Sequence, residues 1–231
     1  MRFRTSSRAR LTRHDAGRFA TGRLFDRIGL ALCDAGCLPR KELYEAWEVA
    51  RRARRLFRGG AVIDIGGGHG LLAHLMLLLD DSSPRAVVVD TTVPASAAKV
   101  HDTLVAGWPR LAGRVSFVSG EPEDVDAGAG DVVVSCHACG ALTDRVIARA
   151  VAAGARLAVL PCCHDIETCD TGGLAGWMDP ALAIDATRAA RLRAAGYHVR
   201  TQTIPPAITP KNRLLMGSAD SLQRAAAVRV S

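Results

Sequence analysis

The sequence has no long apolar segment. None of its apolar runs approaches the roughly 18 residues of a membrane-spanning helix, and the longest, residues 71–79, is interrupted by His74. The basic N-terminus, residues 1–8, is not followed by an apolar stretch. This argues against a secretory signal and leaves an organellar transit peptide as the alternative. We expect a cytoplasmic protein without a membrane segment.

Lysine is almost missing, with 3 Lys against 27 Arg. The charge is also uneven, because residues 1–60 hold 15 of the 30 basic residues and only 6 of the 23 acidic ones. A basic segment suits a polyanion such as RNA, since clustered arginines neutralise phosphates and release counterions. The alternatives are an ordinary solvated face and, for the arginines near residue 55, compensation of a helix dipole.

From residue 60 onward, short apolar runs alternate with helical patterns. This predicts an α/β fold with a seven-stranded, mostly parallel, doubly wound Rossmann-like sheet in residues 59–231, preceded by a basic arm and helices in residues 1–58. The expected strands are residues 61–65, 86–90, 114–119, 131–136, 156–160, 197–204 and 213–217. The expected helices are residues 19–32, 40–57, 71–79, 95–105, 143–152 and 180–195.

The first expected strand ends in Asp64 and runs into a glycine-rich turn before a helix. Gly66, Gly68 and Gly70 let the backbone turn tightly and approach a ligand closely, beside the free N–H groups of the helix N-terminus. The turn predicts a cofactor with a nucleotide part. Dinucleotide-binding domains use a similar turn, so it does not identify the cofactor.

Acidic residues follow the next two strands. Asp90 can accept hydrogen bonds from both hydroxyls of a ribose. Glu121 stands where methyltransferases often place an acid near the adenine amine, and its neighbours Glu123 and Asp124 could substitute for it. From residue 60 to 217 the pattern resembles class I S-adenosylmethionine (SAM)-dependent methyltransferases. The resemblance implies that SAM is the cofactor, and we expect it to contact Asp64, Gly66, Gly68, Gly70, Asp90, Glu121 and Cys136. A doubly wound domain that binds another nucleotide is the alternative.

Cysteine, histidine and aspartate residues follow the fourth and fifth strands, in residues 135–144 and 160–165. Neighbouring parallel strands end at one edge of the sheet, so these side chains should meet beside the methyl group of the cofactor. Imidazole titrates near neutral pH, so His137 and His164 are the candidate bases, and Asp144 or Asp165 could orient one of them. The alternative for each histidine is a structural hydrogen bond.

The same two segments resemble a methyltransferase-like family that includes eukaryotic tRNA 2′-O-methyltransferases acting in the acceptor stem. The matching residues are His137, Cys139, Gly140, Thr143, Asp144, Cys162, Cys163, His164 and the run from Thr209 to Arg213. The resemblance implies tRNA as the partner and a ribose hydroxyl as the acceptor. The chain lacks the N-terminal Cys/His zinc modules of the eukaryotic tRNA enzymes, so fold and cofactor carry over better than substrate.

The seven cysteines are an odd number without an export signal, which predicts reduced thiols. Cys136, Cys139, Cys162, Cys163 and His164 are numerous enough to hold a zinc ion, but adjacent cysteines rarely both reach one metal. A redox pair or a cysteine nucleophile is the second interpretation. We adopt the third, in which the cysteines pack around the cofactor and no metal is bound.

Taken together, these patterns predict a SAM-dependent methyltransferase that acts on RNA through its basic N-terminal segment. The first alternative is a small-molecule methyltransferase whose N-terminal helices form a lid. The alternative from another class is a non-catalytic SAM-binding partner or a thiol-based sensor.

Overall fold

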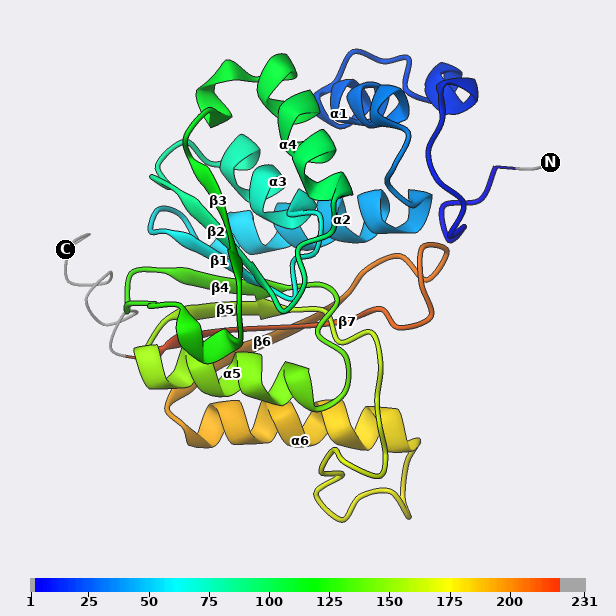
Figure 1. Cartoon of the computed structure of the whole chain (residues 1–231). Coiled ribbons are helices and arrows are strands. Elements are labelled where there is room, and N and C mark those ends of the chain that lie inside the picture. Colours follow the sequence, from blue (N-terminus) through cyan, green and yellow to red (C-terminus); the bar gives the residue numbers. More distant parts are fainter. Residues whose placement is uncertain (1–2, 221–231) are drawn as a thin grey trace.

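The computed structural model describes residues 3–220, and from β1 onward its helices and strands follow one another in the order that the sequence predicts (Figure 1). The helices are α1 (Leu24–Ala35), α2 (Arg40–Leu56), α3 (Leu71–Leu79), α4 (Ser96–Gly107), α5 (Ala141–Ala153) and α6 (Pro180–Ala194). The strands are β1 (Val62–Ile65), β2 (Ala86–Asp90), β3 (Val115–Ser119), β4 (Val132–Ser135), β5 (Arg156–Val159), β6 (Tyr197–Thr203) and β7 (Arg213–Ala219). No helix within residues 3–220 is both long and apolar enough to cross a membrane.

The seven strands form one sheet in the order β3-β2-β1-β4-β5-β7-β6. The strands from β3 to β5 pair in parallel, whereas β7 runs antiparallel to both β5 and β6. Seven strands were expected and are present, but the sheet is mixed, so the description as mostly parallel and doubly wound needs correction. The reason is the connection between β6 and β7: residues 204–212 are too few for the crossover that a parallel pair requires.

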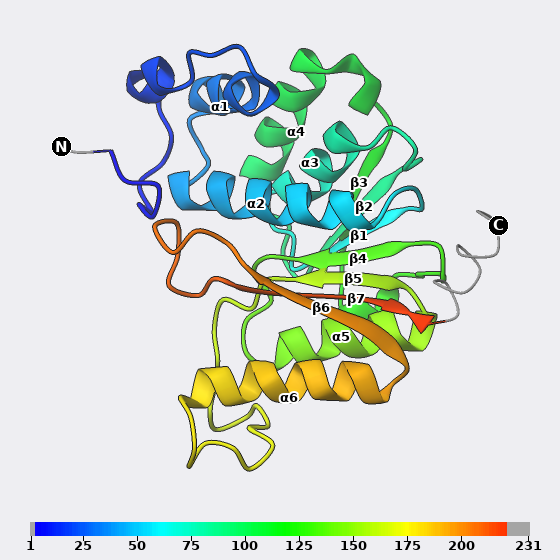
Figure 2. The ribbon, with the colours of Figure 1, turned by 180° about the vertical axis from the view of Figure 1, so that it is seen from behind.

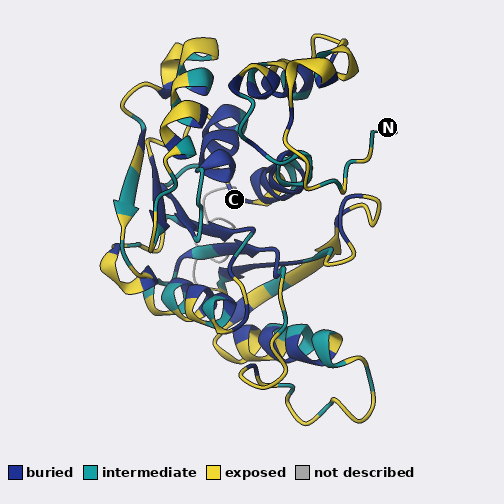
Figure 3. Ribbon diagram, turned by 45° about the vertical axis from the view of Figure 1, so that its right-hand side comes forward, coloured by how far each residue is buried: buried dark blue, intermediate teal, exposed yellow. Residues whose placement is uncertain are grey.

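Helices cover both faces of the sheet, with α2, α3 and α4 on one side and α5 and α6 on the other (Figures 1 and 2). Alternate residues of β4 serve the two sides: Val132 and Val134 join the core under α2 and α3, and Val133 joins the core under α5. The central strands are therefore buried, while the edge strand β6 is largely exposed (Figure 3).

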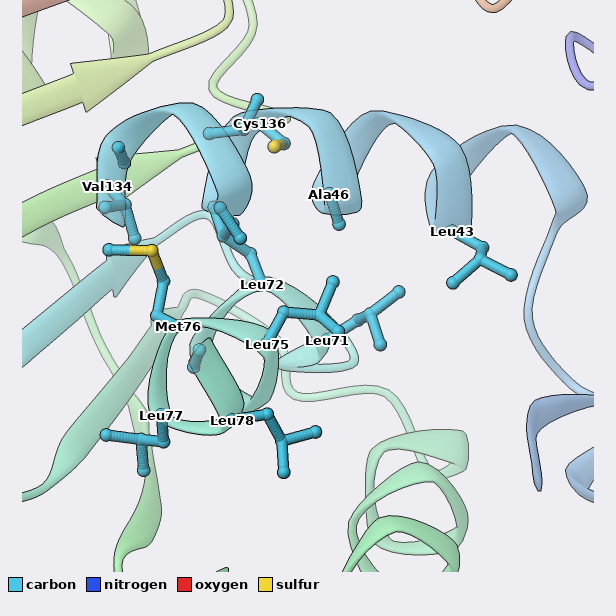
Figure 4. Close-up of a cluster of buried hydrophobic side chains, with 14 of the residues drawn as sticks. Leu43, Ala46, Leu71, Leu72, Leu75, Met76, Leu77, Leu78, Val134 and Cys136 are labelled. Carbon is cyan, nitrogen blue, oxygen red and sulfur yellow. The ribbon is translucent and has the colours of Figure 1, made fainter. Parts of the chain in front are cut away.

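Helix α3 is apolar on almost every side because it is enclosed by other elements. Leu43 and Ala46 of α2 point toward it, and Leu72, Leu75 and Met76 fill the space between (Figure 4). Helix α2 thus shares a core with the sheet, although it precedes the expected boundary at residues 58 and 59. That boundary stays a prediction, and residues 221–231 of the second segment lie outside the described residues.

The N-terminal segment differs most from expectation. The helix expected from residue 19 begins at Leu24, since Gly22 has a positive φ of 69° and the Asp26 carboxylate accepts hydrogen bonds from the N–H and hydroxyl of Thr21. The basic arm is also held in place near its end, where the Leu11 N–H donates to the Leu38 carbonyl at 2.8 Å. Met1 and Arg2 of the arm lie outside the described residues.

Three of the four arginines in residues 51–55 form ion pairs within the protein. Arg54 is 2% exposed and pairs with Asp80 at 3.2 Å, and its guanidinium also donates to the Ser83 hydroxyl at 2.8 Å. Arg51 and Arg52 both pair with Glu48. These contacts give Arg51, Arg52 and Arg54 a structural role, whereas Arg55 is exposed.

Candidate active site

A cavity of about 360 Å³ lies at the carboxyl ends of β1, β2 and β4. The strand order switches between β1 and β4, and ligands of open α/β sheets bind at such a switch point. The glycine-rich turn after β1 forms one wall, and residues 120–122 and 136–142 contribute from neighbouring loops. Glu42 and Ala46 of α2 complete the lining.

The glycine-rich turn meets the cavity with backbone rather than side chains. Gly66, Gly68 and Gly70 all have positive φ, but only Gly66 and Gly68 line the cavity. Gly70, although expected to contact the cofactor, packs inward, where a Cβ would come within 2.9 Å of Phe117 and Val88. A Cβ on Gly68 would meet no protein atom within 4 Å, although Gly68 lines the cavity. A side chain at Gly68 would therefore extend into open cavity space. The glycine-rich turn therefore leaves room for a cofactor that lies directly against its backbone.

Two aspartates brace this turn. The Asp64 carboxylate is 1% exposed and accepts the Ala73 N–H at 3.1 Å, in the first turn of α3. Burial raises the pKa of Asp64 to about 7, and the nearby charge of Asp90 acts in the same direction. Asp90 Oδ2 accepts the Gly68 N–H at 3.0 Å while Asp90 lines the cavity. Both residues thus lie where a cofactor contact was expected.

Glu121 and Cys136, which were also expected to contact the cofactor, line the cavity too. Glu121 Oε2 accepts a hydrogen bond from Arg145 Nη1 at 2.9 Å, so its carboxylate is oriented by α5. Cys136 is 3% exposed, and burial raises the pKa of its thiol well above the ordinary range. An uncharged thiol at this point forms part of the apolar wall.

His137 is the one candidate catalytic residue that lines the cavity. Within residues 3–220 its ring makes no hydrogen bond, so both ring nitrogens are available to a ligand. Burial lowers the pKa of His137 to about 4, with smaller contributions from Lys41 and His69. The ring is therefore neutral near pH 7 and does not titrate there, whereas titration near neutral pH was expected from the sequence.

Asp144 and His164 do not line the cavity. Both carboxylate oxygens of Asp144 accept hydrogen bonds from Arg188 of α6, at 2.9 and 2.8 Å. His164 Nε2 lies 2.8 Å from Asp185 Oδ1, and the second oxygen of Asp185 accepts from Arg213 at 2.6 Å. These contacts tie α5, α6 and β7 together. The convergence of all three candidates on one point, which was expected from the strand order, is not what the structure shows.

Two cavity residues were not anticipated from the sequence. Burial raises the pKa of Glu42 to about 7, with a further contribution from Glu45. His69 stands within the glycine-rich turn and its Nδ1 lies 2.9 Å from the Ser96 hydroxyl. A histidine between glycines could have been noticed, but an acid in the first turn of a helix is ordinary because it complements the helix dipole.

Three cysteines form a separate group at the edge of this region. The Sγ atom of Cys139 lies 3.1 Å from that of Cys162 and 3.3 Å from that of Cys163, and the adjacent pair is 3.8 Å apart. Cys136 and His164 are not members of the group. Burial raises the pKa values of Cys139 and Cys162.

Residues 42–168 match the family described as "Methyltransferase domain", and the chain belongs to this family because more than half of it is covered. With the seven-stranded sheet, this makes the chain a methyltransferase domain of α/β fold, with SAM as the cofactor. No curated protein matches the chain.

Solved structures share the fold at low identity. An O-methyltransferase family protein from Burkholderia thailandensis is 21% identical, with 90% of this chain and 63% of that chain covered and a TM-score of 0.53. A putative O-methyltransferase from Nostoc punctiforme PCC 73102 is 16% identical, with 86% and 62% covered and a TM-score of 0.52. Mitomycin 7-O-methyltransferase is 20% identical, with 88% and 60% covered and a TM-score of 0.50. The chain spans about three fifths of the length of these proteins.

Proposed function

We propose that the protein transfers a methyl group from SAM to a ribose 2′-hydroxyl of RNA, with tRNA as the substrate. The observation that carries the proposal is a set of exposed arginines in the N-terminal arm, Arg4, Arg8 and Arg10. None of them takes part in an ion pair within residues 3–220. Unpaired arginines beside a cavity favour a substrate that brings its own negative charge.

The arm lies against the start of α2, which is also the part of α2 that reaches the cavity. The Ser7 and Ala9 carbonyls accept the N–H groups of Lys41 and Arg40, each at 3.0 Å. Arg10 is also close enough to the cavity to act on one of its residues. Burial lowers the pKa of His69, which lines the cavity, and the charge of Arg10 lowers this pKa further. A phosphate bound by the arm would therefore lie close to the cavity entrance.

SAM supplies an electrophilic methyl group on a sulfonium when it is bound. Methylation of a hydroxyl oxygen also requires that the hydroxyl proton be removed. The ring of His137 lines the cavity without a hydrogen-bond partner within residues 3–220, so one of its nitrogens can take that proton. The glycine-rich turn and Asp90 would hold the cofactor, and Glu42 lies on the side of the cavity formed by α2.

A small-molecule acceptor is the second candidate. Helix α2 covers part of the cavity through Glu42 and Ala46, as a lid over a small substrate would. The fold is also that of mitomycin 7-O-methyltransferase, at 20% identity. Salt separates the two candidates, because RNA binding weakens steeply with ionic strength and the turnover of a small neutral acceptor does not.

The proposal can be tested by removing the charge of the arm. Changing Arg4, Arg8 and Arg10 together to Gln should weaken tRNA binding and reduce the slope of log K against log salt by up to about 3, with SAM affinity unchanged. Arg85, Arg193 and Arg200 are exposed elsewhere, so their triple Gln variant is the matched control for net charge. If both triple variants bind tRNA like the wild type, the arm has no part in RNA binding and the small-molecule candidate gains.

A further inference from the structure

The three thiols of Cys139, Cys162 and Cys163 come from two loops that the fold brings together. Cys139 follows β4, while Cys162 and Cys163 follow β5, and β4 and β5 are parallel neighbours. A hydrogen bond from the Gly140 N–H to the Cys163 carbonyl, at 3.2 Å, joins the two loops directly beside the thiols. The three thiols are therefore brought together by the pairing of β4 with β5 and by this backbone hydrogen bond, as well as by their side-chain rotamers.

The spacing of the sulfur atoms is close to that of a metal site. A tetrahedral zinc ion with Zn–S bonds of about 2.3 Å places its sulfur ligands about 3.8 Å apart. The Sγ atoms of Cys162 and Cys163 are 3.8 Å apart, whereas the Sγ atom of Cys139, which lies 3.1 and 3.3 Å from them, needs to move away by about 0.5 to 0.7 Å. A small rotation of the Cys139 side chain, which is exposed, supplies this change.

The sequence favoured cysteines that bind no metal; on the geometry of the group we propose instead that Cys139, Cys162 and Cys163 form a three-thiolate site for Zn²⁺ whose fourth position is open to a ligand from outside the chain. Within residues 3–220 no other Cys, His, Asp or Glu ligand atom joins the group. Thiolates select soft cations over Mg²⁺ or Ca²⁺, and three protein ligands with one open position are the arrangement of catalytic zinc sites. Cys139 also lines the cavity, so the ion would stand at the cavity wall.

Zinc uptake by the full-length, tag-free protein tests the proposal directly. Protein reduced with a phosphine and stripped with a chelator should retain about one Zn²⁺ per chain after dialysis against the metal, and no Mg²⁺. Cys139→Ser, Cys162→Ser and Cys163→Ser should each weaken Zn²⁺ binding about tenfold or more, with the thermal transition of each variant recorded as a check on folding. Cys37→Ser is the matched control, because Cys37 is a partly exposed free thiol outside the group.

Cobalt substitution tests the open position. Co²⁺ bound by the wild type should give the visible absorption bands of a tetrahedral thiolate site, and added imidazole should shift them by occupying the fourth position. Zinc binding that survives when Cys139, Cys162 and Cys163 are all changed to Ser, or no zinc uptake by the reduced wild type, would overturn the site. Bands that do not respond to imidazole would overturn its open position. A Cys139–Cys162 disulfide in protein isolated without reductant, together with no zinc uptake after reduction, would establish a redox pair instead.

Discussion

Replacing Asp90 by alanine removes an acceptor that serves both the glycine-rich turn and the expected ribose of SAM. In the structure Asp90 Oδ2 accepts the Gly68 N–H at 3.0 Å and Oδ1 accepts the Thr92 N–H at 3.3 Å. Leaving buried polar groups without partners costs about 1 to 3 kcal/mol. By calorimetry, SAM should therefore bind the Asp90→Ala variant about 5- to 150-fold more weakly than the wild type.

A second variant separates the two roles of Asp90. Asp90→Asn keeps one side-chain oxygen for the Gly68 N–H but loses the charge and the second acceptor, so its SAM affinity should lie between those of the wild type and Asp90→Ala. Asp102→Ala removes an exposed acid on α4 outside the cavity lining and serves as the control. Unchanged SAM affinity in Asp90→Ala would refute the assignment of this strand end to the ribose.

Three further predictions concern single positions. Gly68→Val should abolish SAM binding in calorimetry, because its side chain would occupy open cavity space; retained binding would place the cofactor elsewhere. His137→Ala should reduce the methyl-transfer rate by about 100-fold or more while SAM affinity stays the same. If His164→Ala loses this much rate and His137→Ala does not, His164 is the base instead. Burial lowers the pKa of His74 to about 4, so as the pH falls the unfolded state is protonated at this residue before the folded state is. The free energy of unfolding should therefore fall by up to about 3 kcal/mol as the pH drops from about 6.5 to about 4. Urea unfolding of the wild type and His74→Gln isolates this contribution, and identical pH profiles would contradict it.

The fold was largely predictable because its strands are short apolar runs buried on both faces. Residues 86–90 and 71–79 form β2 and α3 with the expected bounds, and the other elements from β1 onward begin and end within two residues of expectation. The direction of β7 was not predictable from these runs, since an apolar strand looks the same in either direction. The late start of α1 depends on the Asp26 carboxylate holding Thr21, a side-chain contact that periodicity does not reveal.

The candidate site was predictable where it depends on strand ends and not where it depends on distant partners. Asp64, Asp90 and the glycine-rich turn follow strands directly, and all reach the cavity. Asp144 and His164 also follow strands, but Arg188 and Asp185 of α6 hold them away from it, and nothing near them in sequence indicates those partners. The cysteine group depends in the same way on a contact between two loops.

Methyl transfer by the purified protein tests the central claim most directly. The protein alone would be incubated with total tRNA and SAM carrying a labelled methyl group, and the RNA would then be digested to nucleosides for mass spectrometry. We predict label on the ribose of a 2′-O-methylated nucleoside, reduced by about 100-fold or more in His137→Ala. Tight SAM binding with no label in RNA, and transfer to a small hydroxyl compound instead, would contradict the assignment to RNA.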